Sequence, residues 1–273
     1  MPSTIKLAAF DVDGTLVDKD GTLLPRTGAA IRRALAGGIH IVLATGRAYH
    51  GVQHLVQELD LKDPLILVNG ALVTTARGQV LWQEAMPTAD IELLLDYCRN
   101  QAFTIVAFTA DDLVHVFIPR KGREQERVLR DIDSFGLHRR RLVPHWEGLP
   151  REKVLKVMVS GRNPDHVQQG MEKWPPRLEH LNYGRSFPLW LEINGEGVDK
   201  ARALELVAAN LGIPASQTLA VGDGETDIPM LKWAQIGVLI QDGGVSVYNG
   251  EGFAPPRPVA EGAAWALEIF ALV

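Results

Sequence analysis

Short apolar runs that end at polar residues recur along the first part of the chain. Residues 5–10, 39–44 and 65–68 are almost wholly apolar, which indicates three buried strands. Helices are expected between them, over residues 27–36 and 48–59. An alternation of buried strand, turn and helix predicts a parallel sheet that is flanked by helices.

The middle of the chain, from residue 82 to residue 193, has a different pattern. Alternating runs joined around Asp111 and Asp112 indicate antiparallel strands, and the segments between them favour helices. Such a mixture predicts an α+β lobe inserted into the sheet domain. The expected strands are 104–108, 113–118, 154–159 and 189–193, and the expected helices are 123–135 and 164–174.

The first pattern then resumes. The expected elements are a helix over 199–211, a strand over 218–221, a helix over 227–234, a strand over 236–240 and a helix over 261–271. Ligands of such sheets bind beyond the carboxyl ends of the strands. Asp11, Thr45 and Asn69 all follow a predicted strand, so we expect them to converge.

Composition narrows the possible functions. The chain of 273 residues is 46% hydrophobic and carries a net charge of −5, which argues against a protein that coats nucleic acid. No apolar stretch is long enough to cross a bilayer, and no signal peptide is visible. The single cysteine, Cys98, excludes an intrachain disulfide and fits a reducing compartment. We therefore expect a cytoplasmic protein without a membrane or nucleic-acid partner.

Two pairs of acids follow predicted strands. Asp11 and Asp13 are two residues apart, and Asp223 and Asp227 are four apart around a glycine turn. Carboxylates that lie together disfavour each other's ionisation unless a cation compensates them, and hard oxygen ligands suit Mg²⁺. Taken alone, the first pair is equally compatible with a solvated turn. The second is also compatible with a helix N-terminus, where acids are favoured.

Two further positions fit a phosphate site. Thr45 offers a hydroxyl and a backbone N–H at an expected helix start, although it is also compatible with a simple helix cap. Lys200 opens a predicted helix, where a surface lysine is the plainer interpretation.

In their order along the chain, these segments resemble the four motifs of the haloacid dehalogenase superfamily. The motifs are residues 11–16 (Asp-Val-Asp-Gly-Thr-Leu), residues 45–47 (Thr-Gly-Arg), Lys200, and residues 222–227, with Asp223 and Asp227. The long insert before Lys200 is similar to the large C2-type (IIB) cap of the Cof-type phosphatases. The resemblance implies an α/β fold, with a Rossmann-like, doubly wound parallel-sheet core and an inserted α+β cap. The expected core is residues 1–82 and 194–273, and the expected cap is residues 83–193.

The resemblance also implies the chemistry. Asp11 would be the nucleophile that forms an aspartyl-phosphate, and Asp13 would be the general acid and base. An acid at the position of Asp13 favours a phosphatase or a phosphomutase, because the family's dehalogenases lack one there and its ion-pumping ATPases have threonine. Thr45, Gly46, Asn69 and Lys200 would bind the phosphoryl group. The implied ligands of Mg²⁺ are Asp11, the main-chain carbonyl of Asp13, Asp223 and Asp227.

Some positions depart from the family pattern or stay unassigned. Thr226 replaces the usual asparagine, which puts one contact to phosphate or metal in doubt, and the role of Arg47 stays open. After the last strand the chain has Gln241-Asp242-Gly243 in place of the usual sequence. A basic run at residues 138–141 is interpreted first as a solvated face, and second as a site for another anionic group of the substrate.

The expected function is magnesium-dependent hydrolysis of small phosphate monoesters, with sugar phosphates or similar metabolites as substrates, by a monomer or homodimer. Two alternatives remain from the sequence. A phosphomannomutase-like phosphotransferase would need a bisphosphate activator and would not release phosphate steadily. A non-catalytic phospho-ligand-binding module would have no need of the intact acids and Lys200.

Overall fold

The computed structural model of the chain describes residues 4–241, 244–248, 250–254 and 256–272. It forms two compact units. The first contains the described residues of Met1–Gly46, Gln53–Leu81 and Asp199–Val273. The second contains Arg47–Val52 and Trp82–Val198. The chain therefore leaves the first unit and returns to it twice.

A five-stranded sheet is the centre of the first unit. Its strands, in spatial order, are β14 (Gly244–Val247), β13 (Ile236–Gln241), β12 (Thr218–Gly222), β1 (Leu7–Phe10) and β2 (His40–Leu43). All neighbours are parallel except β13 and β14. β1 lies between β2 and β12, so Leu7 is opposite His40 on one side and Thr218 on the other. Every residue of β1 is buried, as its apolar sequence predicts.

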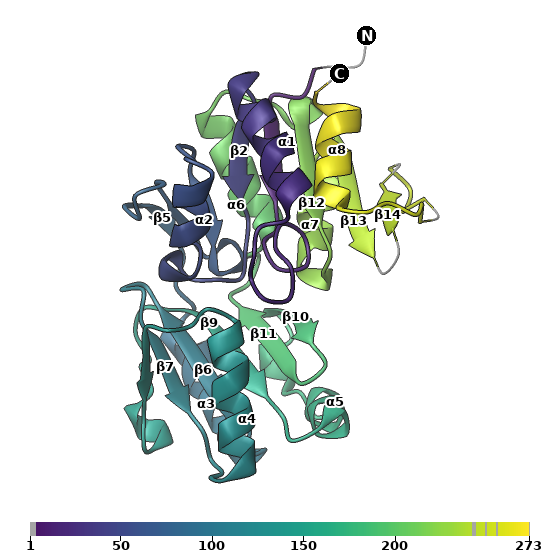
Figure 1. Ribbon diagram of the computed structural model, residues 1–273. Helices are drawn as coiled ribbons and strands as arrows, with labels where there is room; N and C mark the ends of the chain where they lie inside the picture. Colours follow the sequence, from purple (N-terminus) through teal and green to yellow (C-terminus); the bar gives the residue numbers. More distant parts are fainter. Residues whose placement is uncertain (1–3, 242–243, 249, 255, 273) are drawn as a thin grey trace. The chain divides into compact units, whose positions relative to one another are not determined.

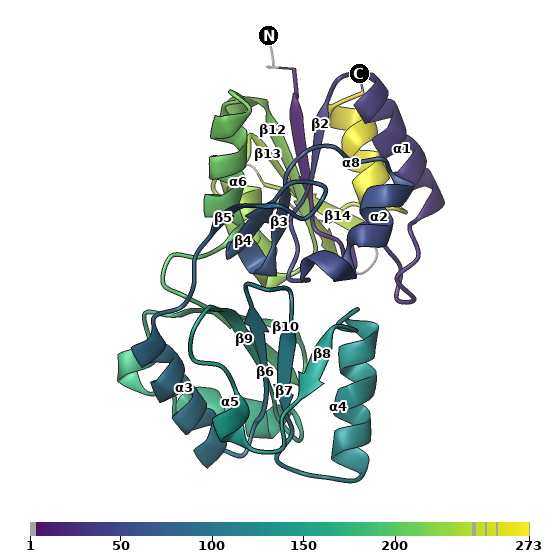
Figure 2. The ribbon, with the colours of Figure 1, turned by 90° about the vertical axis from the view of Figure 1, so that its left-hand side faces the viewer.

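Helices cover both faces of this sheet. α1 (Pro25–Ala36) and α8 (Gly262–Phe270) pack together on one face, and α6 (Lys200–Asn210) lies on the other with α7 (Ile228–Trp233) beside it (Figures 1 and 2). α1 begins with Pro25 in its first turn and buries Ala30, Ile31 and Ala34 along one stripe. The predicted Rossmann-like, doubly wound core is confirmed.

The third predicted strand is only partly as expected. Residues 65–67 form β3 (Leu65–Leu67), but its main partner is the antiparallel β4 (Leu72–Thr74), and β5 (Val80–Gln83) completes this three-stranded sheet. One parallel bridge between Ala44 and Ile66 connects it to the end of β2. The prediction erred because an apolar run does not reveal which strand will pair with it.

The helix predicted over residues 48–59 is wrong in its first half. A short 3₁₀ turn, Tyr49–Gly51, precedes α2 (Gln53–Glu58). The N–H groups of Gly51 and Val52 close tight turns onto the carbonyls of Ala48 and Tyr49. Arg47 Nη1 also donates to the Gly51 carbonyl, at 2.9 Å. These bonds use backbone groups that a continuous α-helix would need.

The second unit is an α+β lobe around a six-stranded sheet. The spatial order of its strands is β10 (Asn182–Phe187), β11 (Trp190–Asn194), β9 (Val154–Ser160), β6 (Thr104–Thr109), β7 (Val114–Phe117) and β8 (Arg140–Leu142). Only β7 and β8 are parallel. α3 (Thr88–Asn100) and α5 (Pro164–Glu172) share one apolar core with the sheet, and this core includes Cys98.

The other face of this sheet carries α4 (Arg123–Ser134). Its Asp131 accepts a hydrogen bond from Trp190 Nε1 at 3.1 Å. Two arginines of the basic run at residues 138–141 pair with acids of the same unit: Arg139 contacts Asp112 at 3.0 Å, and Arg140 contacts Asp133. Among the described residues, no helix combines the length and the apolar character that a membrane crossing requires.

A glycine contact between β13 and α7 provides a test of the core. A Cβ at Gly237 would lie 2.0 Å from the carbonyl oxygen of Leu231. Gly237→Ala is therefore expected to lower the free energy of unfolding by about 1–3 kcal/mol or more, because backbone must shift. Gly252→Ala, with open space at its Cβ, is the matched control and is expected to stay within about 0.5 kcal/mol of the wild type. Urea denaturation measures both, and equal stabilities would contradict the packing argument.

Candidate active site

Polar residues of the first unit meet at the carboxyl ends of its central strands. Asp11 follows β1, Thr45 follows β2 and Asp223 follows β12, and these three strands are direct neighbours. The Asp11 N–H donates to the carbonyl of Val221 at 2.9 Å, so Asp11 is still held in the sheet. The parallel arrangement therefore delivers these residues to one edge, as predicted.

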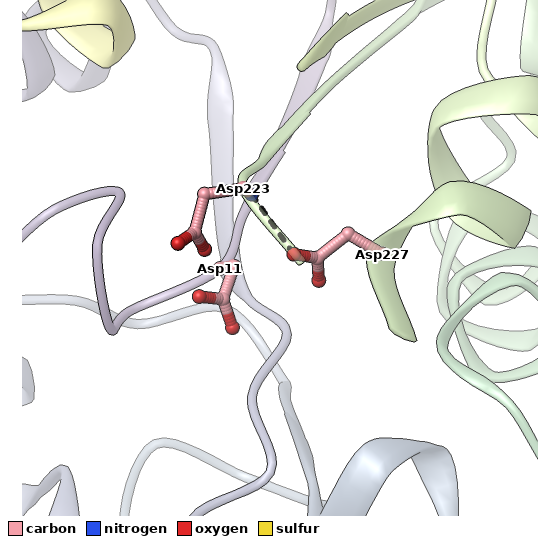
Figure 3. Close-up of side chains that lie close together, drawn as sticks. All are labelled: Asp11, Asp223 and Asp227. Atoms are coloured by element: carbon pink, nitrogen blue, oxygen red, sulfur yellow. Dashed lines mark hydrogen bonds between the residues drawn. The ribbon is translucent and has the colours of Figure 1, made fainter. Parts of the chain in front are cut away.

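Three carboxylates gather at this edge. One oxygen from each of Asp11, Asp223 and Asp227 lies within 4.8 Å of the others (Figure 3). Asp11 and Asp227 are buried, whereas Asp223 is exposed. A cluster of three carboxylates at this spacing could bind a metal ion.

Lys200, at the start of α6, supplies the positive charge of this cluster. Its Nζ donates to Asp11 Oδ1 at 2.7 Å and to Asp227 Oδ1 at 2.6 Å. Only 2% of Lys200 is exposed, so the plainer interpretation of a surface lysine is wrong. Asp199 fixes the start of α6, because its Oδ1 accepts the N–H of Arg202 at 2.8 Å.

Asp227 uses both of its oxygens within the protein. Oδ1 binds Lys200. Oδ2 accepts the N–H of Asp223 at 3.0 Å (Figure 3) and also the N–H of Gly224 at 2.9 Å. Asp227 thus holds the loop that carries Asp223 as well as the ammonium group of Lys200.

Burial and like charges shift the ionisation of the cluster. Burial raises the pKa of Asp11 well above its ordinary value; Lys200 opposes this, while Asp227 and Asp223 add to it. Although part of Asp223 is open to solvent, the surrounding protein partly desolvates its carboxyl group, and this desolvation and the charge of Asp227 raise its pKa to about 6. Burial alone would lower the pKa of Lys200, but Asp11 and Asp227 outweigh it and raise that pKa. The lysine is therefore a permanent cation.

Two glycines that the sequence analysis did not single out allow these side chains to approach. Gly14 has a φ of 73°, and a Cβ there would lie 2.2 Å from Asp223 Oδ2. A Cβ at Gly222 would lie 2.5 Å from Asp227. The glycines flank the acids in both acidic motifs, which is the signal that could have identified them.

Asp13, the second acid of the first motif, lies in the turn after Asp11 and is half-buried. Asp13 also adds to the negative potential that raises the pKa of Asp223. In the same turn, the Thr15 hydroxyl approaches Asp223 Oδ1 at 3.5 Å.

Thr45 lies at this edge but not as predicted. Its N–H donates to the carbonyl of Ile66 at 2.9 Å, and no helix begins there. The predicted free N–H at a helix entrance is therefore wrong, because the bridge to β3 uses it. The side chain of Thr45 is fully buried, and Gly46 follows it as the last residue of this segment of the first unit. The Asn69 N–H donates to the Thr45 carbonyl at 3.0 Å.

Two positions were left open by the sequence. Arg47 belongs to the second unit, where its guanidinium donates to the Gly51 carbonyl. Thr226 is half-buried in the short turn Glu225–Asp227. Asp242 and Gly243, which also depart from the family pattern, lie outside the described residues.

Known proteins share this architecture. A sequence model of the haloacid dehalogenase-like hydrolases matches residues 8–249. The chain is 29% identical to M6_Spy0533 of Streptococcus pyogenes serotype M6, over 88% of each chain. It is 26% identical to YcsE of Bacillus subtilis, a 5-amino-6-(5-phospho-D-ribitylamino)uracil phosphatase, over 86% of this chain and 83% of YcsE.

A solved structure agrees with these sequence relatives. BT1666 of Bacteroides thetaiotaomicron, described among the phosphatases of the haloalkanoate (HAD) superfamily, has a TM-score of 0.71 and 29% identity. The similarity covers 86% of this chain and 83% of BT1666. This chain belongs to the family of haloacid dehalogenase-like hydrolases.

The charge of Lys200 can be tested in the metal-free protein. Lys200→Met leaves Asp11 and Asp227 buried without their cation and is expected to lower the free energy of unfolding by about 3–5 kcal/mol at pH 8 in EDTA. Lys62→Met removes an exposed lysine that pairs with Asp60, and it is expected to change the free energy of unfolding by less than about 1 kcal/mol. Urea denaturation compares the two, and similar small effects would refute a stabilising role for Lys200.

Proposed function

We propose that this haloacid dehalogenase-like hydrolase is a phosphatase that cleaves small phosphate monoesters through the carboxylate of Asp11. The observation that carries the proposal is the pairing of Asp11 with the buried ammonium of Lys200, inside a cluster of three carboxylates. A carboxylate beside a fixed cation can meet an anionic phosphoryl group that it would otherwise repel. The enzyme class is that of a phosphoric monoester hydrolase.

The reaction has two steps. An Asp11 carboxylate oxygen attacks phosphorus, the bond from phosphorus to the ester oxygen breaks, and Asp13 gives its proton to the leaving alkoxide. Asp13, now ionised, takes a proton from water, whose oxygen attacks the aspartyl-phosphate. The bond between phosphorus and Asp11 then breaks, which releases inorganic phosphate and restores both acids. Asp13 suits the role of accepting a proton from water because it lies two residues beyond Asp11 and is half-buried, where water can reach it.

Lys200 and Thr45 are the proposed ligands of the phosphoryl oxygens. Lys200 is positioned for this because it already binds Asp11, and its raised pKa keeps it charged throughout. The proposed contact of Thr45 is through its hydroxyl, since its N–H donates to the carbonyl of Ile66. Asn69 and Gly46 are proposed to complete the phosphate site beside Thr45.

The donor set also fits a divalent cation. Three carboxylates with oxygens within 4.8 Å are hard ligands. Burial, and after it the like charge of neighbouring carboxylates, raises the pKa of Asp11 and of Asp223, and a bound cation would favour their ionised forms. We propose that Asp11, Asp223 and the main-chain carbonyl of Asp13 hold Mg²⁺, with Asp227 positioning them from behind. When bound, Mg²⁺ would neutralise charge on the nucleophile and the phosphoryl group.

The substrate class is proposed from the relatives and the chain's own organisation. YcsE acts on a phosphorylated ribityl compound, which is a small metabolite with a sugar-like chain. We therefore propose a phosphorylated sugar or similar metabolite as the substrate. The second unit, with its six-stranded sheet, is the proposed cap that selects it. The single, buried Cys98 fits the reducing cytoplasm as the compartment.

Substitution of the two acids tests the mechanism. Asp11→Asn is expected to abolish turnover because an amide is a poor nucleophile, and Asp13→Asn is expected to lower kcat by about 10²–10⁴-fold. The measurement is free phosphate released from a panel of phosphorylated metabolites, with Mg²⁺ and with EDTA. Asp20→Asn, an exposed acid of the same loop, is the matched control.

The outcomes separate three functions. Full rates for Asp11→Asn, or in EDTA, would exclude the proposed mechanism. Phosphate transfer that needs a bisphosphate and releases no free phosphate would indicate a mutase. An inactive wild-type chain that still binds phosphorylated metabolites would indicate a binding module.

The pKa of Asp223 predicts how metal and pH act on stability. The folded, metal-free protein keeps the Asp223 proton up to about pH 6, whereas the unfolded chain loses it near pH 4. The folded state binds more protons in this window, so its free energy of unfolding falls as the pH rises through it. Because Mg²⁺ requires ionised carboxylates, it is expected to raise Tm more at pH 8 than at pH 5.

Thermal unfolding with and without Mg²⁺ measures this difference at each pH. Asp223→Asn is expected to lose most of the stabilisation by Mg²⁺ at pH 8. An equal rise of Tm at both pH values in the wild type would contradict the proposed metal site.

A further inference from the structure

The turn Val68–Gly70 has an unusual backbone. Its three residues have φ values of 54°, 57° and 96°, all in the left-handed region. Glycine and asparagine adopt this region readily, but the β-branched Val68 does so only under strain. Val68 and Asn69 are both buried. Strained backbone persists only where surrounding contacts enforce it, and it is frequent at functional sites.

One side of the turn is bound to Thr45. The Asn69 N–H donates to the Thr45 carbonyl at 3.0 Å, and the Thr45 N–H donates to Ile66 at 2.9 Å. Ile66 and Asn69, which lie before and after Leu67 and Val68, thus bind the backbone N–H and the backbone carbonyl of Thr45. The position of the turn is therefore coupled to the position of Thr45.

The other side of the turn packs closely against the backbone at the start of α6. A Cβ at Gly70 would lie 2.1 Å from the Asp199 carbonyl oxygen and 3.2 Å from the backbone nitrogen of Lys200. This is contact between two backbones, with no flexible side chain that could yield. Gly70 is therefore the residue that permits the close approach.

We propose that the turn Val68–Gly70 is a positioning element, which sets the start of α6 against Thr45 and thereby aims Lys200 at Asp11. The inference rests on the proposed role of Lys200 in holding the phosphoryl group. Its physical basis is that hydrogen bonds act only over short distances: Lys200 Nζ is 2.7 Å from Asp11 and 2.6 Å from Asp227. A backbone shift of about 1 Å at Lys200 would break both hydrogen bonds, and such shifts can reduce turnover by about 10²-fold.

Gly70→Ala tests this contact, and Gly38→Ala is its matched control. Both glycines have a positive φ, 96° and 81°, but a Cβ at Gly38 meets nothing within 4 Å. The two variants therefore share backbone strain, and only Gly70→Ala displaces Asp199 and Lys200. The measurements are kcat/KM, the Ki of inorganic phosphate, and the rise of Tm with Mg²⁺.

For Gly70→Ala we expect kcat/KM to fall about 100-fold and the phosphate Ki to rise about 10-fold, with the response of Tm to Mg²⁺ retained. Gly38→Ala is expected to stay within about twofold of the wild type in kcat/KM and Ki. A merely structural role of Gly70 would lower Tm or the active fraction but leave Ki unchanged. A phosphate Ki equal in the two variants would overturn the proposal.

A second pair of variants covers the case in which Gly70→Ala does not fold. Val68→Gly loosens the turn without adding an atom, and Val73→Gly removes a valine of similar burial from β4. Only Val68→Gly is expected to raise the phosphate Ki, about 3-fold or more, and equal Ki values would overturn the proposal. Failure of the proposed function is recognised separately, because the wild type and Asp11→Asn would then release phosphate at the same rate.

Discussion

The site depends on one buried cation among three carboxylates. Asp11 and Asp227 are both buried, and each is held by the ammonium of Lys200. Without the charge of Lys200, no cation among the described residues would offset the cost of desolvating these two adjacent carboxylates at this position. One lysine does not neutralise three ionised acids, however, so a negative excess would remain, and it adds to burial, the main cause, in raising the pKa of Asp11 and of Asp223. A site that retains such an excess is prepared to take up a divalent cation.

Close backbone packing makes this concentration of charge possible. Gly14 admits Asp223, Gly222 admits Asp227 and Gly70 admits the start of α6, in each case where a Cβ would overlap with its neighbour. Asp227 adds order to the same region, because its carboxylate binds two consecutive N–H groups of the Asp223 loop. The precision of the site thus comes from backbone contacts that surround the reactive groups.

The sequence predicted the strands and the acids well because both depend on local pattern. An almost wholly apolar run such as residues 5–10 favours a buried strand, and acids that follow neighbouring parallel strands meet at one edge of the sheet. Lys200 was predicted only through its place in the family motif, since nothing near it in the sequence indicates burial.

The wrong predictions depend on contacts between distant segments. The N–H of Thr45 is taken by Ile66, and the expected helix over 48–59 is interrupted where Arg47–Val52 joins the second unit. The hydrophobic pattern near these residues indicates neither of these contacts. The positive φ values of Val68 and Asn69 are not visible in the local pattern either, and the contacts of this turn are with the distant residues Thr45 and Asp199.

The pairing of β1 with β12 has a consequence for how the chain acquires its structure during synthesis. Leu7 pairs with Thr218, so the central pair of the sheet joins residues from nearly opposite ends of the polypeptide. β1, the strand that Asp11 follows, therefore leaves the ribosome long before β12 exists, and β2 is its first available neighbour. By contrast, the strands of the inserted lobe lie close in sequence and can pair as they emerge. The lobe can therefore fold before the sheet edge that carries Asp11 and Asp223 is complete.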